Sequence, residues 1–218
     1  EHLFRALEGD PAIVAAHLVQ RDGPFRHTYV ASGWAEPLPP EACPFVLIDF
    51  GLRRRLSGAW QREVVTTLRD ALPGTFRGTS SAHLARTLGL PAVGTMAHEY
   101  LQTYQALPGD LRDFQRRALA DWWDEFGPTL AVALTDVVGM QAFLADFGPE
   151  LARHYVGLRH DSGDPLVWAE QALAHYARLG LDARNKRLVF SDGLDTARAI
   201  ALYRALRTRA QLAFGIGT

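Results

Sequence analysis

Polar segments that contain glycine, aspartate or arginine directly follow short apolar runs at seven places along the chain. The guanidinium fork of arginine suits phosphate and carboxylate groups, and Gly, Ser and Thr let backbone N–H groups approach a phosphate closely. Aspartate accepts hydrogen bonds from sugar hydroxyls or helps to hold a divalent cation. Together these residue types suit phosphate and ribose chemistry. They occur in residues 49–55, 78–81, 94–99, 135–136, 159–164, 191–195 and 215–218.

Taken singly, each segment has an ordinary structural explanation. The Gly-Thr-Ser-Ser sequence at 78–81 is also a common start of a helix, and the Ser-Asp-Gly sequence at 191–193 is a common turn. Their occurrence after successive strands is what favours a binding site, because the carboxyl ends of parallel strands meet at one edge of a sheet.

His98 is the best candidate for a reactive side chain. It follows a Gly-Thr pair, lies in the first turn of a predicted helix and has Glu99 beside it. A neutral imidazole near pH 7 can act as a base or as a nucleophile toward phosphorus. His160 competes for this role, but alternation along a strand points it away from Arg159 and Asp161. We interpret His83, His154 and His175 as structural, and no His-x-x-x-His or Cys-x-x-Cys spacing predicts a protein-built metal site.

The elements that must position these residues alternate between short apolar runs and longer amphipathic stretches, which predicts an α/β fold with a parallel barrel or a doubly wound sheet. In the stretches, apolar residues recur near i, i+3, i+4 and i+7, as one face packed on a sheet requires. The predicted strands are 45–49, 75–78, 91–94, 130–134, 156–159, 187–190 and 211–214. The predicted helices are 59–71, 81–88, 97–106, 111–126, 140–147, 165–179 and 194–207.

A proline-rich stretch at residues 36–40 marks the best candidate domain boundary. Residues 1–44 lack the alternation and are assigned to an accessory segment, with a helix expected at 11–20 and a strand at 28–31. Residues 45–218 form the main domain.

Composition excludes several classes of protein. The 218 residues are 48% hydrophobic and 22% charged, which excludes disorder, collagen and coiled coil for the chain as a whole. A net charge of −1 gives no electrostatic case for nucleic acid or an anionic membrane. Lys186 is the only lysine among 23 basic residues, so the others are all arginine. Codon bias explains this excess of arginine more simply than oxyanion binding does. Cys43 is the only cysteine and no long apolar run is present, so we expect a cytoplasmic protein.

From Phe45 to Thr218 the ordered motifs resemble the nicotinate phosphoribosyltransferases, a type II phosphoribosyltransferase family. The resemblance implies an irregular (β/α) barrel, incomplete in this chain, without the family's N-terminal domain and C-terminal end. It also implies a homodimer with a shared active site that joins nicotinate to 5-phosphoribosyl 1-pyrophosphate in NAD salvage, using Mg²⁺ and ATP through a transient phosphohistidine. The motifs are Asp49-Phe50-Gly51-x-Arg53-Arg54, Gly78-Thr79-Ser80, Gly94-Thr95-Met96-Ala97-His98-Glu99, Ala133-Leu134-Thr135-Asp136, Gly157-Leu158-Arg159-His160-Asp161-Ser162-Gly163-Asp164-Pro165, Phe190-Ser191-Asp192-Gly193-Leu194-Asp195 and Phe214-Gly215-Ile216-Gly217-Thr218.

Carried over residue by residue, the resemblance implies that His98 is the phosphorylated histidine, with Glu99 orienting its imidazole and Asp161 in a catalytic role. Phe50 falls where an aromatic ring stacks on the pyridine, and Arg53 where an oxyanion is held. Arg159 and Asp161 fall in the segment that contacts the base and the ribose hydroxyls. The remaining implied substrate contacts are Gly78, Thr79, Ser80, Thr135, Ser162, Asp192, Gly193, Gly215, Gly217 and Thr218.

Two positions depart from the family pattern, and two other functions stay open. Ser81 stands where the family commonly has Asn, and Gln141 where it often has Asp. The first alternative is a related phosphoribosyltransferase that uses quinolinate or nicotinamide. The second is a non-catalytic fragment that binds phosphate-bearing ligands or folds only with a partner polypeptide.

Overall fold

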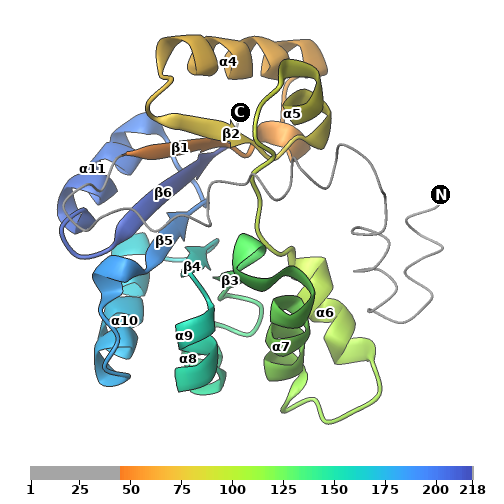
Figure 1. The fold of residues 1–218 in the computed structure, drawn as a ribbon, viewed down its shortest axis with the longest axis vertical. Coiled ribbons are helices and arrows are strands. Elements are labelled where there is room, and N and C mark those ends of the chain that lie inside the picture. The colour runs from red at the N-terminus through yellow and green to blue at the C-terminus, as the bar shows by residue number, and fades with distance from the viewer. Residues whose placement is uncertain (1–44, 218) are drawn as a thin grey trace.

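Six strands form one sheet in the order β2-β1-β6-β5-β4-β3, and every neighbouring pair is parallel. A computed structural model describes residues 45–217 (Figure 1). The strands are β1 (Val46–Asp49), β2 (Phe76–Thr79), β3 (Val132–Leu134), β4 (Gly157–His160), β5 (Arg187–Phe190) and β6 (Gln211–Ile216). The helices are α4 (Gly58–Ala71), α5 (Ala82–Leu88), α6 (His98–Ala106), α7 (Phe114–Phe126), α8 (Met140–Asp146), α9 (Pro149–His154), α10 (Pro165–Arg178) and α11 (Thr196–Leu206), with short 3-10 turns η1 (Gly51–Arg53), η2 (Gly127–Leu130) and η3 (Ala183–Asn185).

The strands are buried on both faces, as the apolar runs predict for a parallel sheet. On the inner face, Ile48 of β1 and Val132 of β3 belong to one apolar cluster, although three strands separate β1 from β3 in the sheet. Ala213 of β6 and Val189 of β5 lie between them in the same cluster, so this face carries a continuous apolar layer, as expected for part of a (β/α) barrel.

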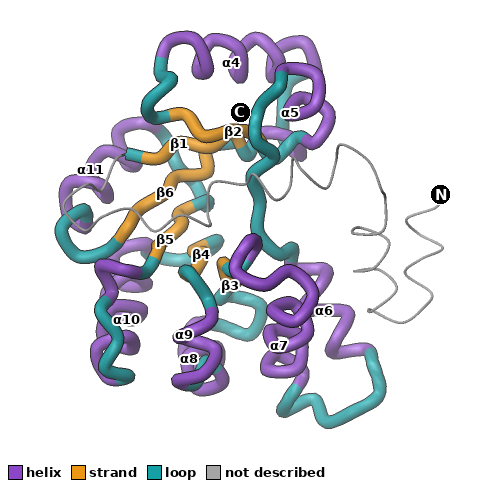
Figure 2. Tube along the Cα trace, viewed as in Figure 1, coloured by secondary structure: helices purple, strands orange, loops and turns teal. Residues whose placement is uncertain are grey.

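Helices cover the outer face of this sheet (Figures 1 and 2). Helices α4 and α5 contact β2, α10 contacts β4, and α11 contacts β6. The outer core includes Phe143, Phe147, Tyr155 and Tyr176, all fully buried. The buried Tyr155 hydroxyl donates a hydrogen bond to the Leu119 carbonyl at 2.7 Å, which ties the chain before β4 to α7. Among the described helices, none combines the length and the apolar character that a membrane crossing needs.

The sequence placed most elements correctly, with one strand wrong. The predicted strand 91–94 is a single bridge between Thr79 and Ala92. Pro91 has no N–H to donate, so this segment makes only the bonds from Thr79 N to Pro91 O and from Val93 N to Thr79 O. Helix α9 was not predicted, and its six residues are too few for a helical periodicity to show. The expected helix 11–20 and strand 28–31 lie outside the described residues.

His175 links α10 to the end of α8. Its imidazole is 3% exposed, and its Nε2–H donates to the Phe147 carbonyl at 2.8 Å. The Nδ1 atom accepts from the Arg178 guanidinium at 2.6 Å. Burial lowers the pKa of His175, so the folded state favours the neutral ring.

We predict that His175 makes the stability of the fold depend on pH. Because the folded pKa lies below the unfolded one, its stabilising effect is present above about pH 6.5 and is lost as pH falls through the lower folded pKa. His175→Gln keeps an amide N–H near the Nε2 position and cannot titrate in this range. Urea unfolding from pH 7 to pH 5 should therefore show a smaller loss of unfolding free energy in His175→Gln than in the wild type.

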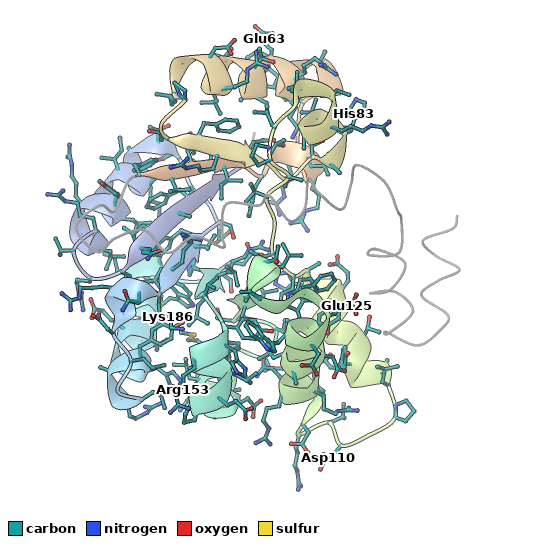
Figure 3. All side chains as sticks on the ribbon, in the orientation of Figure 1. Glu63, His83, Asp110, Glu125, Arg153 and Lys186 are labelled. Atoms are coloured by element: carbon teal, nitrogen blue, oxygen red, sulfur yellow. The ribbon has the colours of Figure 1, made fainter. Side chains whose placement is uncertain are left out.

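The matched control is His83→Gln. His83 is exposed on α5 and points away from the sheet (Figure 3). This variant should follow the wild-type pH profile. Identical profiles for His175→Gln and the wild type would contradict the prediction.

Candidate functional site

The candidate site lies where the strands end. His98 begins α6, Asp136 follows β3, and Asp161 follows β4, so three segments distant in sequence reach the same edge of the sheet. Parallel strands bring their carboxyl ends together, and the residues after them can vary without disturbing the core. The structure thus places together the groups that the sequence predicted there.

The His98 imidazole lies between two carboxylates. Its Nε2 atom is 3.1 Å from Asp136 Oδ1, and its Nδ1 atom is 3.8 Å from Asp161 Oδ2. The imidazole is 35% exposed, whereas the two carboxylates are 16% and 17% exposed. Ser162 Oγ donates to Asp136 Oδ2 at 2.7 Å, which leaves Oδ1 facing His98. Because a carboxylate only accepts hydrogen bonds, Nε2 carries the proton and Nδ1 has the lone pair in the neutral ring.

Arg159 joins four parts of the site. Its Nη2 donates to Asp161 Oδ1 at 2.8 Å, and its Nε donates to Ser191 Oγ at 2.8 Å. Its Nη1 donates to Thr95 Oγ1 at 3.0 Å. The guanidinium carbon lies 5.6 Å from the centre of the Phe50 ring, in cation–π range. Arg159 therefore neutralises Asp161 and orients its second oxygen toward His98.

The Phe50 ring rests directly on β6. A Cβ atom built on Gly215 would lie 2.5 Å from Phe50 Cδ2, closer than side-chain atoms tolerate. Only glycine at position 215 lets the ring occupy this place. Phe50 and Gly215, two predicted substrate contacts, thus pack against each other.

Asp49 ties β1 to its neighbours beneath the site. This carboxylate is 2% exposed. Its Oδ2 accepts from Thr79 Oγ1 at 2.5 Å and from Gln61 Nε2 at 2.8 Å, and its Oδ1 accepts from Gly51 N at 2.9 Å. Thr79 Oγ1 also accepts from Ser81 N at 3.0 Å. The Thr79 hydroxyl, predicted to contact substrate, is therefore used inside the protein.

Glu99 is not the group that orients His98. Neighbouring residues of a helix lie about 100° apart around its axis, and Glu99 faces solvent while His98 faces the site. Over residues 45–217 the Glu99 carboxylate makes no hydrogen bond to His98, and Asp136 stands in its place. A negative charge in the first turn of α6 instead suits the positive end of the helix dipole.

The other predicted residues divide into buried and exposed groups. Gly78 is buried against Pro91, whose carbonyl oxygen would lie 2.3 Å from an added Cβ. Thr135 is buried, accepts from Trp168 Nε1 at 2.9 Å and donates to the Arg159 carbonyl at 3.0 Å. Arg53, Ser162, Asp192, Gly193 and Gly217 are exposed, Ser80 is partly exposed, and Thr218 lies outside the described residues.

Sequence reasoning assigned no role to four residues that contribute to the site. Asp136 was noted at a strand end but not assigned a role, although its position directly after β3 was the available signal. Thr95 and Ser191 lie in strand-end segments that the sequence singled out, but their partner Arg159 is distant in sequence and could not be identified; Trp168, on α10, carries no such signal. Ser81, which stands where the family commonly has Asn, caps α5 by accepting from Leu84 N at 3.3 Å, which confirms the helix start indicated by Gly-Thr-Ser-Ser.

We predict that Thr79→Val destabilises the fold although the two side chains have nearly the same shape. The change removes one of the two hydrogen bonds to Oδ2 of buried Asp49 and takes the acceptor from the Ser81 N–H, which should cost about 1–3 kcal/mol. Thr87→Val is the control, since Thr87 is exposed on α5 and should change stability by less than about 0.5 kcal/mol. Equal midpoints of thermal unfolding for the two variants would refute the role of Asp49.

Comparison with known proteins supports one family. The model of the nicotinate phosphoribosyltransferase (NAPRTase) family matches residues 45–218. A curated nicotinate phosphoribosyltransferase of Herminiimonas arsenicoxydans is 59% identical over 80% of this chain and 44% of its own. That of Edwardsiella ictaluri is 46% identical over 100% of this chain and 52% of its own. The chain thus spans about half the length of the curated relatives it matches.

Solved structures give the same result. The crystal structure of nicotinate phosphoribosyltransferase from Vibrio cholerae superposes with a TM-score of 0.75 and 37% identity, over 95% of this chain and 51% of the other. The enzyme of that name from Porphyromonas gingivalis superposes with a TM-score of 0.74 and 29% identity, over 95% and 54%. By sequence and by fold, this chain belongs to the nicotinate phosphoribosyltransferase family.

Proposed function

We propose that the protein carrying this chain is a nicotinate phosphoribosyltransferase of NAD salvage. It forms nicotinate mononucleotide and pyrophosphate from nicotinate and 5-phosphoribosyl 1-pyrophosphate, and hydrolyses ATP through a phosphohistidine at His98. The observation that carries this proposal is the His98 imidazole held between Asp136 and Asp161 at the strand ends.

The two carboxylates give His98 the properties of a phosphoryl acceptor. Asp136 accepts the Nε2–H and so fixes the tautomer in which Nδ1 is the nucleophile. Asp161 stabilises the positive charge that the ring gains when Nδ1 forms a bond. The bond from Arg159 to Asp161 limits repulsion between that carboxylate and an incoming phosphate.

Two coupled reactions follow from this arrangement. In the first, Nδ1 bonds to the γ-phosphorus of ATP as the bond to the bridging oxygen breaks and ADP leaves, and water later cleaves the P–N bond to release phosphate and free His98. In the second, the pyridine nitrogen bonds to the ribose anomeric carbon as the C–O bond to pyrophosphate breaks. The second passes through an oxocarbenium-like state, so positioning and charge neutralisation supply most of the catalysis.

Phe50 and two arginines provide the groups for the pyridine base. The fixed Phe50 ring offers an aromatic face, with the Arg159 guanidinium beside it. Arg53 is exposed in η1 and makes no hydrogen bond within residues 45–217, so its guanidinium is available to an oxyanion. A cation there favours the carboxylate of nicotinate over the amide of nicotinamide. Asp192 and Gly217, after β5 and β6, are exposed where the ribose and its phosphate would lie.

The residues at His98 fit Mg²⁺ as a cofactor. His98, Asp136 and Asp161 offer ligand atoms that all lie within 4.8 Å of one another. Mg²⁺ prefers one or two carboxylates together with phosphate oxygens and water, which suits two carboxylates that already hold other hydrogen bonds. Asp136 and Asp161 would hold the ion, and its charge would neutralise phosphate oxygens.

We further propose a cytoplasmic homodimer in which one subunit completes the site of the other. Exposed apolar side chains near the Phe50 turn support such an interface: Leu56 is 84% exposed, Trp60 45% and Leu52 43%. The single cysteine agrees with a reducing compartment.

The test is nicotinate mononucleotide formation with Mg²⁺, with and without ATP, in the longest natural polypeptide that contains this chain. We expect ATP to stimulate the wild type. His98→Ala should lose that stimulation and the acid-labile ³²P label from [γ-³²P]ATP, while slow ATP-independent turnover persists. His83→Ala, an exposed histidine on α5, is the control and should behave as the wild type.

Other outcomes favour the alternatives. Equal loss of both rates in His98→Ala would show that His98 serves the ribosyl transfer or the fold instead of energy coupling. Turnover of quinolinate or nicotinamide without ATP stimulation would favour a related phosphoribosyltransferase. Absence of any product from a folded protein would favour a non-catalytic binding role.

We also predict that Gly215→Ala weakens binding of the base. The added Cβ displaces the Phe50 ring, so KM for nicotinate should rise about tenfold, equivalent to about 1.4 kcal/mol, while KM for 5-phosphoribosyl 1-pyrophosphate changes less. Gly74→Ala is the control, because no atom lies within 4 Å of its added Cβ. An unchanged KM for nicotinate in Gly215→Ala would remove Phe50 from the base site.

A further inference from the structure

His160 is a buried histidine that the proposed chemistry does not use. It is the last residue of β4 and is 1% exposed. Side chains alternate along a strand, so Arg159 points into the site and His160 points to the outer face, under α10. There its ring packs edge-on against Trp168, with centroids 5.4 Å apart, and tilted against Phe190 at 5.9 Å.

The only hydrogen bond of this imidazole within residues 45–217 reaches the turn after the strand. His160 Nε2 lies 3.2 Å from the Gly163 carbonyl oxygen. Because a carbonyl only accepts, Nε2 carries the proton, and the buried Nδ1 has no partner in this part of the chain. Burial lowers the pKa of His160, which keeps the ring neutral with this single donor.

The turn that His160 holds carries two residues of the site. Asp161 and Ser162 lie between the hydrogen-bonded residues His160 and Gly163, and Gly163 reverses the chain with a φ of 85°. Asp161 faces His98 and accepts from Arg159, and Ser162 donates to Asp136. The position of both carboxylates beside His98 therefore depends on the conformation of this turn.

Trp168, on the helix α10 that covers His160, supports the Asp136 carboxylate. Its Nε1–H donates to Thr135 Oγ1 at 2.9 Å, and Thr135 directly precedes Asp136. Trp168 and His160 are in contact, so one aromatic pair beneath the site reaches Asp136 through Thr135 and Asp161 through Gly163.

We propose that His160 is a positioning residue: its hydrogen bond to the Gly163 carbonyl fixes the 161–163 turn so that Asp161 and Ser162 hold the two carboxylates at His98. The effect of His160 on turnover rests on the proposed function. The effect of His160 on the conformation of the 161–163 turn is independent of that function. The same imidazole also explains why the strand ends in a buried polar residue where packing alone would favour an apolar one.

Two substitutions separate the effect of the hydrogen bond from His160 to Gly163 from the effect of burying the side chain. The amide nitrogen of Gln in His160→Gln can take the place of Nε2, whereas the shorter Asn in His160→Asn reaches only the Nδ1 position. Crystal structures of both variants of the longest natural polypeptide should show Asp161 Oδ2 displaced from His98 Nδ1 in His160→Asn and retained in His160→Gln. The ATP-coupled kcat should fall about tenfold or more in His160→Asn, with KM for both substrates changed less, and should largely recover in His160→Gln.

His175→Asn is the matched control for loss of stability. His175 is also buried, lies on α10 and donates to a backbone carbonyl, but on a part of the fold away from the strand ends. This variant should lower the thermal midpoint as much as His160→Asn does while keeping kcat.

The outcomes are separable. An unmoved Asp161 in His160→Asn, or equal losses of kcat in the Asn and Gln variants at equal stability, would overturn the proposal and leave His160 as a packing residue. A wild type that forms no product would count against the proposed function alone, because the crystal structures still decide whether His160 holds the turn.

Discussion

The Arg159 guanidinium is the interaction on which the geometry of the site depends. It is 16% exposed and bonds at once to Asp161 beside it, to Ser191 after β5 and to Thr95 before α6, with Phe50 after β1 against its face. A planar group with five fixed donors can satisfy such a set, whereas a lysine ammonium has three donors and no flat face. The segments after β1, before α6 and after β5 are far apart in sequence, and the guanidinium contacts all three. Arg159 also places a positive charge 2.8 Å from Asp161, beside which Asp136 brings a second carboxylate to His98.

Strand β4 serves the site on both of its faces. Arg159 and Asp161 face inward, toward His98, while His160 faces the aromatic side chains of the outer core. The polar network at the strand ends therefore rests on a packed apolar layer, not on solvent-exposed loops. Close packing allows little adjustment, so small displacements in that layer change distances at His98. After β3, too, one residue faces the packed layer and the next faces the site. Thr135 is buried between Trp168 and the Arg159 backbone, and its neighbour Asp136 reaches His98.

Features set by the local sequence pattern could be predicted, whereas contacts between residues distant in sequence could not. Strand ends are a local signal that led to His98 and to the segment of Asp161, the family resemblance added Phe50 and Gly215, and the structure brings all four to one edge. The partner of His98 was assigned to Glu99 because sequence adjacency was the only evidence, whereas the carboxylate that reaches Nε2 comes from Asp136, 38 residues away. The strand at 91–94 was wrong because an apolar run does not reveal that Pro91 removes a donor. The bond between Thr79 and Asp49 was not predicted, because a buried partner distant in sequence leaves no mark in the local pattern.

The order of the strands has a consequence for how the chain acquires its fold. Strands β3, β4 and β5 pair with neighbours close to them in sequence. Among the strands that the structure describes, β1 at Val46–Asp49 pairs on one side with β6 at Gln211–Ile216, and β6 alone connects β1 and β2 to the other three. Contacts between such distant segments form slowly because a long loop must close first. During synthesis on the ribosome, strands β3, β4 and β5 can therefore assemble early, while β1, β2 and Phe50 join them only after β6 has left the exit tunnel.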